Sequence, residues 1–186
     1  MWERYSLQIP KSPLGKKRGG LLILFTVLLL AAIGWIWWGN STIQVSRLSI
    51  ASQRLPASFE GFTIAQVSDL HNASFDGGQE KLLQLIREND PDIIAVTGDL
   101  VDANHTDLEA ALAFIEGATE IAHVYYVTGN HEAWWPSYAD LERELQQAGV
   151  TVLRDAYVFL ERDGQSICLA GLDDPAFYSE GNLLDE

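Results

Sequence analysis

The sequence contains little cysteine and no internal repeat or low-complexity tract. Cys168 is the single cysteine among 186 residues, which excludes an internal disulfide framework. Because Cys168 lies in the apolar run SICLAG, we expect a small buried side chain there. Hydrophobic residues make up 47% of the chain, so one ordinary domain with its own core can form.

Basic residues are scarce after the first forty positions. The formal net charge is −14, from 12 Lys and Arg against 26 Asp and Glu. Residues 1–39 carry five of the basic residues and one acidic residue, a local net charge of +4, so the remainder carries −18. A domain of that charge repels nucleic acid and anionic membrane surfaces. We therefore predict no nucleic-acid partner, whereas cations suit such a domain.

Charged residues are also absent from Leu21–Trp38, an apolar segment of 18 residues. A helix needs about 20 apolar residues to cross a hydrocarbon core of roughly 30 Å. Basic residues precede the segment, and its end carries tryptophans that are typical of an interfacial aromatic belt, Trp35, Trp37 and Trp38. A cleaved signal peptide is the alternative, although the run is long for one and no clean A-x-A site follows it.

We therefore predict a single-pass protein of the cell membrane. Residues 1–20 would form a basic cytoplasmic flank, and residues 21–38 would form the transmembrane helix. Because a basic flank stays on the inner side of the membrane, the N-terminus would be cytoplasmic and the acidic domain extracytoplasmic.

Predicted strands alternate with predicted helices from residue 62 to residue 153. IQVSRLSI, at residues 43–50, alternates loosely and predicts an earlier strand. The later predicted strands are FTIAQVSD, PDIIAVTGDL, AHVYYVTGN and VTVL. YVFLERDGQSICLAG predicts a hairpin that turns at Asp163-Gly164. This order predicts an α/β fold with a largely parallel sheet and helices on its faces.

Three segments carry helix signals. GGQEKLLQLIREND places leucine and isoleucine at helical spacing. Thr106 and Glu109 have the spacing of a capping box before LEAALAFI. Ser137 can cap the helix YADLERELQQA, and Gly149 can end it.

Polar residues of one kind follow three of the predicted strands. Their leading members are 30 and 31 positions apart, about one strand-helix unit each, so they should lie side by side at the edge where α/β sheets bind ligands. The three groups are Asp69 and His71, then Asp99 and Asp102, then Asn130, His131 and Glu132.

Carboxylate, amide and imidazole ligands at one edge suit divalent ions such as Mn, Fe, Zn or Mg. Alternate residues of an extended strand point the same way, so Asp69 and His71 could hold one ion together. Asp99 could bridge two ions, and Asn130 offers a neutral oxygen to the second. The alternative is that each pair only caps a helix or turns a loop, as Asp and Asn often do.

These motifs, D-x-H, G-D-x-x-D and G-N-H-E, resemble those of the calcineurin-like metallophosphoesterase superfamily. The apolar anchor, RLPASFEGFTIAQVSDLH and AGLDD look like its membrane-anchored bacterial branch. The resemblance covers about residues 43–175. It implies the first part of a four-layer α/β/β/α sandwich with a site for two divalent metal ions.

The resemblance also implies a role for each motif residue. Asp69 and His71 would bind the first metal ion. Asp99 would bridge both ions, and Asn130 would bind the second. His131 would be a catalytic residue that faces the leaving group, and Asp102 would orient it.

The family pattern continues with further histidines, first one alone and then a G-H-x-H pair, whereas the last histidine of this sequence is His131. His105 and His123 come too early to replace them, and we expect a solvated residue and a strand-start residue, respectively. We therefore predict that residues 43–186 are a metallophosphoesterase domain that is incomplete at its C-terminus, an N-terminal part of a longer protein.

The predicted function is that of a membrane-anchored dinuclear-metal phosphoesterase. Its substrate would be a phosphomonoester, a phosphodiester or a pyrophosphate, and it could be lipidic. One alternative is a catalytically incomplete fragment or pseudoenzyme that serves as a metal-dependent surface binding module. Another is a lipid-linked nucleotide-sugar pyrophosphate as substrate. Trp134 and Trp135 either form an aromatic wall near the site or pack against the next helix, and the oligomeric state stays open.

Overall fold

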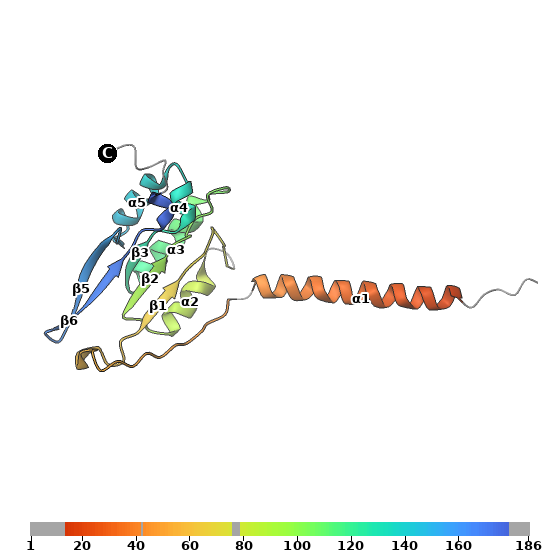
Figure 1. The fold of residues 1–186 in the computed structure, drawn as a ribbon, viewed down its shortest axis with the longest axis horizontal. Coiled ribbons are helices and arrows are strands. Elements are labelled where there is room, and N and C mark those ends of the chain that lie inside the picture. Colours follow the sequence, from red (N-terminus) through yellow and green to blue (C-terminus); the bar gives the residue numbers. More distant parts are fainter. Residues whose placement is uncertain (1–13, 42, 76–78, 179–186) are drawn as a thin grey trace, which may run out of the picture. The chain divides into compact units, whose positions relative to one another are not determined.

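The computed structural model describes residues 14–41, 43–75 and 79–178 (Figure 1). The chain divides into two compact units, Met1–Gln44 and Val45–Glu186. The described part of the first unit is α1 (Leu14–Ser41) together with residues 43 and 44. Within the described residues, only α1 is long and apolar enough to cross a membrane, over Gly19–Ile36.

By length and composition α1 fits either a membrane anchor or a signal sequence. Residues 1–13 and the side chains of Trp37 and Trp38 lie outside what the structure describes. The cytoplasmic flank, most of the aromatic belt and the orientation across the membrane therefore stay predictions.

The second unit is built on a four-stranded parallel sheet whose strands lie side by side in chain order. Ile64 of the first strand lies opposite Ile93 of the second, which lies opposite His123 of the third. The alternation of strands and helices predicted for residues 62–153 is confirmed. The strands are β1 (Ile64–Val67), β2 (Ile93–Thr97), β3 (His123–Val127) and β4 (Thr151–Val152).

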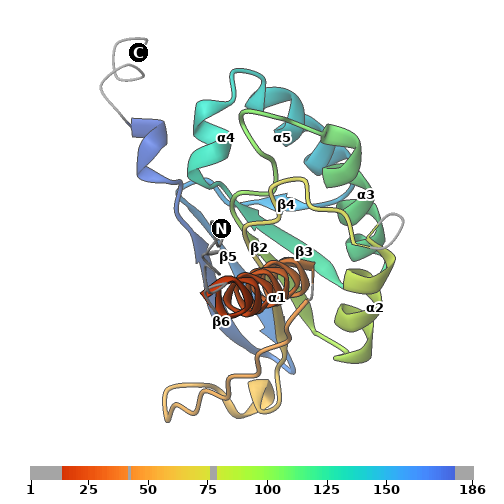
Figure 2. The same ribbon diagram turned by 90° about the vertical axis from the view of Figure 1, so that its right-hand side faces the viewer.

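Three helices cover one face of this sheet, as Figure 2 shows: α2 (Glu80–Glu88), α3 (Leu108–Thr119) and α5 (Tyr138–Gln147). Because parallel crossovers are right-handed and the strands follow in order, each helix falls on the same side. The core lies between the two layers. Its fully buried side chains come from both, including Ile94, Val124, Tyr126, Phe114, Ile115 and Leu141.

The predicted hairpin is confirmed as a second, two-stranded antiparallel sheet of β5 (Ala156–Arg162) and β6 (Gln165–Gly171). Its turn residues, Asp163 and Gly164, have φ angles of 51° and 75°, as a primed hairpin turn requires. The structure therefore shows an α/β fold with a parallel four-stranded sheet, and the complete four-layer sandwich stays a prediction.

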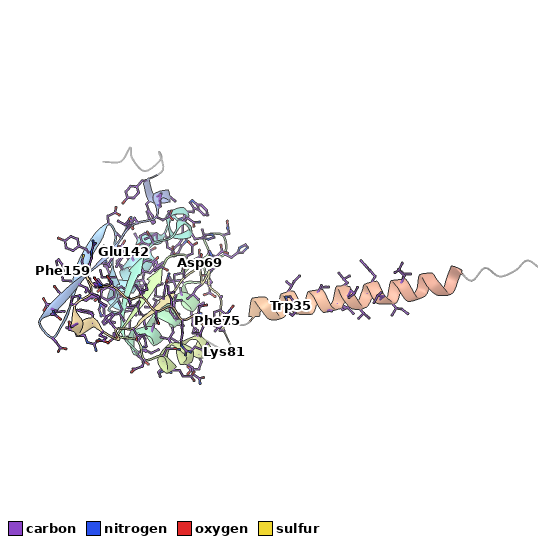
Figure 3. All side chains as sticks on the ribbon, turned by 60° about the horizontal axis from the view of Figure 1, so that its bottom comes forward. Trp35, Asp69, Phe75, Lys81, Glu142 and Phe159 are labelled. Atoms are coloured by element: carbon purple, nitrogen blue, oxygen red, sulfur yellow. The ribbon has the colours of Figure 1, made fainter. Side chains whose placement is uncertain are left out.

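The prediction that Cys168 is buried is wrong, because its side chain is exposed. Cys168 pairs with Phe159 across the hairpin. On the same hairpin face, Tyr157 and Phe159 are also largely exposed, and Figure 3 shows Phe159 on the outer side. Apolar residues follow one another in both strands, and successive side chains point to opposite faces, so partial burial of one face leaves the other face to solvent within the described part of the chain.

Two local predictions near the domain's start and α3 are also wrong. Residues 43–50 form no strand, and Leu48 and Ile50 in that segment are exposed. The N-cap of α3 is Asp107 rather than Thr106, because the Asp107 carboxylate accepts the N–H of Ala110 at 3.1 Å. The Thr106 hydroxyl instead donates to a backbone carbonyl oxygen of the preceding loop.

The remaining signals agree in position with the structure. Ser137 precedes α5, although its side chain makes no capping hydrogen bond, and Gly149 follows that helix with a φ of 86°. His105 is exposed and His123 starts β3, as predicted. The short helices are η1 (Ala57–Phe59), α4 (Asn130–Trp134) and η2 (Pro175–Tyr178).

Candidate functional site

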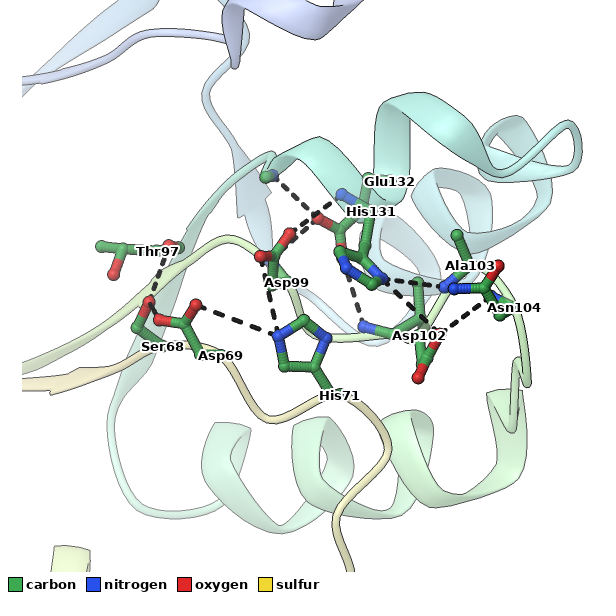
Figure 4. Close-up of polar contacts among 12 residues, drawn as sticks. Ser68, Asp69, His71, Thr97, Asp99, Asp102, Ala103, Asn104, His131 and Glu132 are labelled. Atoms are coloured by element: carbon green, nitrogen blue, oxygen red, sulfur yellow. Dashed lines mark hydrogen bonds and ion pairs between the residues drawn. The ribbon is translucent and has the colours of Figure 1, made fainter.

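The loops that follow β1 and β2 run side by side beyond the end of the sheet. The N–H of His71 donates to the carbonyl oxygen of Asp99 at 2.9 Å, and the N–H of Asn72 donates to that of Leu100 at 3.2 Å. These bonds extend the parallel pairing past the last strand residue. They bring the first two polar groups of the sequence together, as Figure 4 shows.

The backbone at this edge adopts a conformation that is uncommon for residues other than glycine. Asp69, His71, Asn72 and Asp99 have positive φ angles of 56°, 45°, 61° and 51°. Non-glycine residues in the left-handed region carry strain that surrounding contacts must offset, and such residues cluster at functional sites. Positive φ at four polar positions of one edge is an independent sign that this edge is a site.

The prediction that Asp69 and His71 point the same way because both lie on an extended strand is wrong. β1 ends at Val67, so neither residue lies on an extended strand. Their side chains still approach each other, because the left-handed turns fold the loop back. The Nε2 atom of His71 lies 4.0 Å from Oδ1 of Asp69.

His71, Asp99 and His131 form the closest group of potential metal ligands in the described residues. Each offers one ligand atom, and these atoms lie within 4.8 Å of one another. Nε2 of His71 lies 3.7 Å from Oδ2 of Asp99, and the two imidazole rings are 4.4 Å apart between centroids. Imidazole and carboxylate ligands together suit transition metals such as Zn, Mn or Fe. This group could therefore bind a divalent ion.

A buried carboxylate holds the loops that carry these ligands. The side chain of Glu132 is 0% exposed. It accepts the backbone N–H of Asp99 at 2.9 Å, of Val101 at 3.2 Å and of Gly129 at 2.7 Å. Glu132 therefore ties the loop after β2 to the loop after β3, and hydrogen bonds to a charged group are the stronger kind.

Two glycines let the same loops touch through bare backbone. A Cβ atom on Gly98, which has a φ of 84°, would lie 2.8 Å from the Cα atom of Gly129. A Cβ atom on Gly129 would overlap the Asp99 carboxylate. Asp99 in turn accepts the N–H of His131 at 3.0 Å. The positions of Asp99 and His131 are thus coupled through backbone contacts.

His131 has its Nδ1 atom occupied by a backbone donor. The N–H of Ala103 donates to Nδ1 at 3.1 Å, so the proton of the neutral ring lies on Nε2. Oδ1 of Asp102 lies 3.6 Å from the same Nδ1, beyond hydrogen-bond distance. Asp102 instead accepts the N–H of Asn104 at 2.8 Å, which holds the pKa of this carboxyl below its ordinary value.

Residues 62–181 match the sequence profile of a family described as calcineurin-like phosphoesterases. This range covers more than half of the chain and includes all three strand ends of the site. The chain belongs to this family. The resemblance inferred from its three motifs is therefore confirmed at the level of the superfamily.

Individual relatives include animal and bacterial proteins. A Danio rerio protein named "Transmembrane protein with metallophosphoesterase domain" is 26% identical over 86% of this chain and 38% of that protein. "Uncharacterized metallophosphoesterase YkuE" of Bacillus subtilis is 29% identical over 71% of this chain and 48% of that protein. Among solved structures, phosphopantetheinyl hydrolase from Mycobacterium tuberculosis is 20% identical, with a TM-score of 0.44 over 59% of this chain and 41% of that chain.

This chain thus spans less than half the length of each of these three proteins. The relatives come from vertebrates and bacteria alike, so membership of a membrane-anchored bacterial branch of the metallophosphoesterases stays a prediction. One relative is named as a transmembrane protein, which agrees with the apolar helix found here.

The structure brings only some of the metallophosphoesterase motif residues into the His71, Asp99 and His131 group. Asp69 lies at the rim with its side chain 66% exposed, and it accepts a hydrogen bond from the Ser68 hydroxyl. Asn130 is the first residue of α4 and directly follows Gly129, which contacts the loop after β2. Their roles as ligands, and the catalytic roles of His131 and Asp102, stay predictions.

Glu132 is the residue to which the sequence argument assigned no role. It was recognised as part of G-N-H-E, but its backbone partners lie more than 30 positions away in Asp99 and Val101. The available signal was its position three residues after Gly129 at the start of a helix, where a glutamate side chain often accepts backbone N–H groups.

Proposed function

We propose that this protein is a membrane-anchored phosphoesterase that uses two divalent metal ions to hydrolyse a phosphomonoester, phosphodiester or pyrophosphate bond. The observation that carries the proposal is the convergence of His71 and Asp99, with His131 beside them, at the edge matched by the family. The exposed Asp69 carboxylate lies beside the group. Mn, Fe, Zn and Mg all suit this donor chemistry.

The residues of this chain would divide the ions between them. Asp69 and His71 would hold the first ion, Asp99 both ions and Asn130 the second. When bound, two such ions neutralise charge on the phosphate oxygens and lower the pKa of the attacking water. The two clustered carboxylates, Asp69 and Asp99, gain a compensating positive charge in the same event.

His131 is proposed as the general acid rather than as a ligand. The N–H of Ala103 occupies Nδ1, and in a neutral ring the proton then lies on Nε2, so this arrangement favours proton donation by His131 over metal binding. To act as an acid the ring must be doubly protonated, and its Nδ1–H then needs an acceptor. The Asp102 carboxylate is the proposed acceptor, which is supported by its distance of 3.6 Å from Nδ1 and by its lowered pKa.

In this scheme the Nε2–H of the protonated ring passes its proton to the leaving oxygen as the bond to phosphorus breaks. The ring is left neutral, with its remaining proton on Nδ1 facing Asp102, and exchange with water then moves the proton to Nε2 so that Nδ1 again accepts the N–H of Ala103. A general acid of this kind contributes typically 10²–10⁴-fold to the rate.

The decisive test uses Asp99→Asn in the full-length gene product. Metal content and turnover of bis-p-nitrophenyl phosphate and p-nitrophenyl phosphate are measured together, and we expect both to fall, because one carboxylate serves both ions. Asp163→Asn is the matched control, since Asp163 has the same φ of 51° but lies in the hairpin turn. Unchanged metal content and turnover in Asp99→Asn would remove Asp99 from the site.

The wild-type measurement separates the two classes of function. Bound metal with turnover supports the enzyme, whereas bound metal without turnover favours the metal-dependent surface binding module. A lipidic substrate, including a lipid-linked pyrophosphate, is favoured by α1, whose Gly19–Ile36 segment is 0% buried.

We also propose that α1 is an uncleaved anchor with a cytoplasmic N-terminus, as its basic flank favours. Protease added to intact cells should then digest the acidic domain. Protection in sealed cells, with cleavage only after lysis, would contradict this orientation.

A further inference from the structure

Trp134 is a large exposed side chain directly beside the candidate site. Trp134 is 60% exposed. Its ring centroid lies 5.3 Å from that of His131, and the two ring planes are tilted by 47°. The short helix α4 begins at Asn130 and ends at Trp134. One rigid turn therefore carries a proposed ligand, the proposed acid and the indole.

Packing of Trp134 against the following helix does not explain its position. The buried aromatic residue of α5 is Tyr138, whose ring lies 5.2 Å from that of Phe177. Trp134 leaves most of its surface in solvent, although an indole gains more than most side chains from burial. The face of the indole is therefore accessible to a molecule bound at the site.

The location of Trp134 determines which part of a substrate would reach it. A phosphate held at His71 and Asp99 would present its leaving oxygen to His131, 4.4 Å from His71 between ring centroids. Because Trp134 adjoins His131, the group attached to that oxygen would meet the indole, and the phosphate itself would not. This step rests on the proposed function.

We infer that Trp134 is a specificity-determining residue that stacks against a flat, apolar or aromatic substituent of the phosphoester. Stacked aromatic pairs contribute beyond their buried area, and the neighbouring imidazole of His131 adds a second ring surface. The enzyme then favours aryl or nucleobase-bearing esters over small alkyl esters, about tenfold, at the level of binding.

The test compares the inhibition constants of phenylphosphonate and methylphosphonate in the metal-loaded, full-length gene product. Neither compound has a leaving group, so the ratio of the two constants reports binding alone. We expect the preference for the phenyl compound to fall about tenfold in Trp134→Ala and to survive in Trp134→Phe, which keeps a flat ring. Phe159→Ala is the matched control, since Phe159 is 62% exposed on the hairpin, and it should leave the preference unchanged.

Equal weakening of both phosphonates in Trp134→Ala, no change in either, or the same loss in Phe159→Ala would overturn the inference. If Trp134→Ala does not fold, Trp134→Leu provides the same comparison, because leucine is apolar but has no flat face. Turnover by the wild-type protein tests the proposed function separately. An active wild-type enzyme with an unaltered ratio in the variants therefore counts against Trp134 alone.

Discussion

β1, β2 and β3 contribute to two regions of the molecule in different ways. One region is the side of the four-stranded sheet that faces the helices, and the other is the edge where these strands end. On the helix-facing side, Ile94 and Val124 are apolar, fully buried and in regular strand geometry. At the edge, Asp69 and Asp99 are polar, and their backbone has left-handed φ angles. The first region depends on burial of apolar area, whereas the second depends on hydrogen bonds that offset local strain.

The largest effect should be a loss of turnover when the proposed general acid at the edge is removed and the proposed metal ligands are kept. We expect His131→Ala to retain metal and to lose roughly 10²–10⁴-fold in turnover. The loss should be smaller for esters of acidic phenols, whose leaving groups depart without a proton, and Asp102→Asn should show a milder version of the pattern. Loss of metal from His131→Ala would make His131 a ligand instead, and equal slowing of aryl and alkyl esters would rule it out as the general acid.

A smaller effect should come from loosening the loops that carry the ligands. Glu132→Gln keeps the size of the side chain but weakens its hydrogen bonds to the N–H groups of Asp99 and Gly129. Residues that support metal ligands typically contribute about 10–100-fold in metal affinity, so we expect a loss in that range by metal titration. Glu116→Gln on the exposed side of α3 is the control. Equal affinities in both variants would show that the edge does not depend on Glu132.

The smallest effect should come from the core. Ile94→Val removes one buried methylene on the helix-facing side, and the free energy of unfolding should fall by about 1 kcal/mol. Metal affinity of the folded protein should stay at the wild-type value, because Ile94 lies inside β2 and its side chain is in the core, away from the Glu132 hydrogen bonds that hold the loops. A matched drop in metal affinity and stability would show that the two regions are one cooperative unit.

The helix-facing side could be predicted from the sequence because its signals are local. Apolar runs, helical spacing and Gly149 predicted the elements within a few residues of their observed bounds. The segment at residues 43–50 was mispredicted because alternation alone cannot supply a neighbouring strand. Burial of Cys168 was mispredicted for a related reason, since a hairpin has two faces and the sequence does not say which one is covered.

The edge was predictable in its residue types but not in its geometry. Motif spacing placed Asp69, His71 and Asp99 near one another, yet the left-handed turns that bring them together have no periodic signal. Glu132 acts on backbone N–H groups, which every sequence contains, so its partners cannot be read from residue types. The donor at Nδ1 of His131 is likewise a backbone group, that of Ala103.

The bare-backbone contact between Gly98 and Gly129 has a consequence for ion selectivity. The close backbone contact limits how near the two loops can approach, and the hydrogen bonds of Glu132 to Asp99 and Gly129 oppose their separation. The side chain of Asp69 takes no part in these contacts and is 66% exposed at the rim of the site. Under the proposed assignment of Asp69 as a ligand, exchange of one metal for another should therefore move the Asp69 carboxylate while the two hydrogen-bonded loops stay in place.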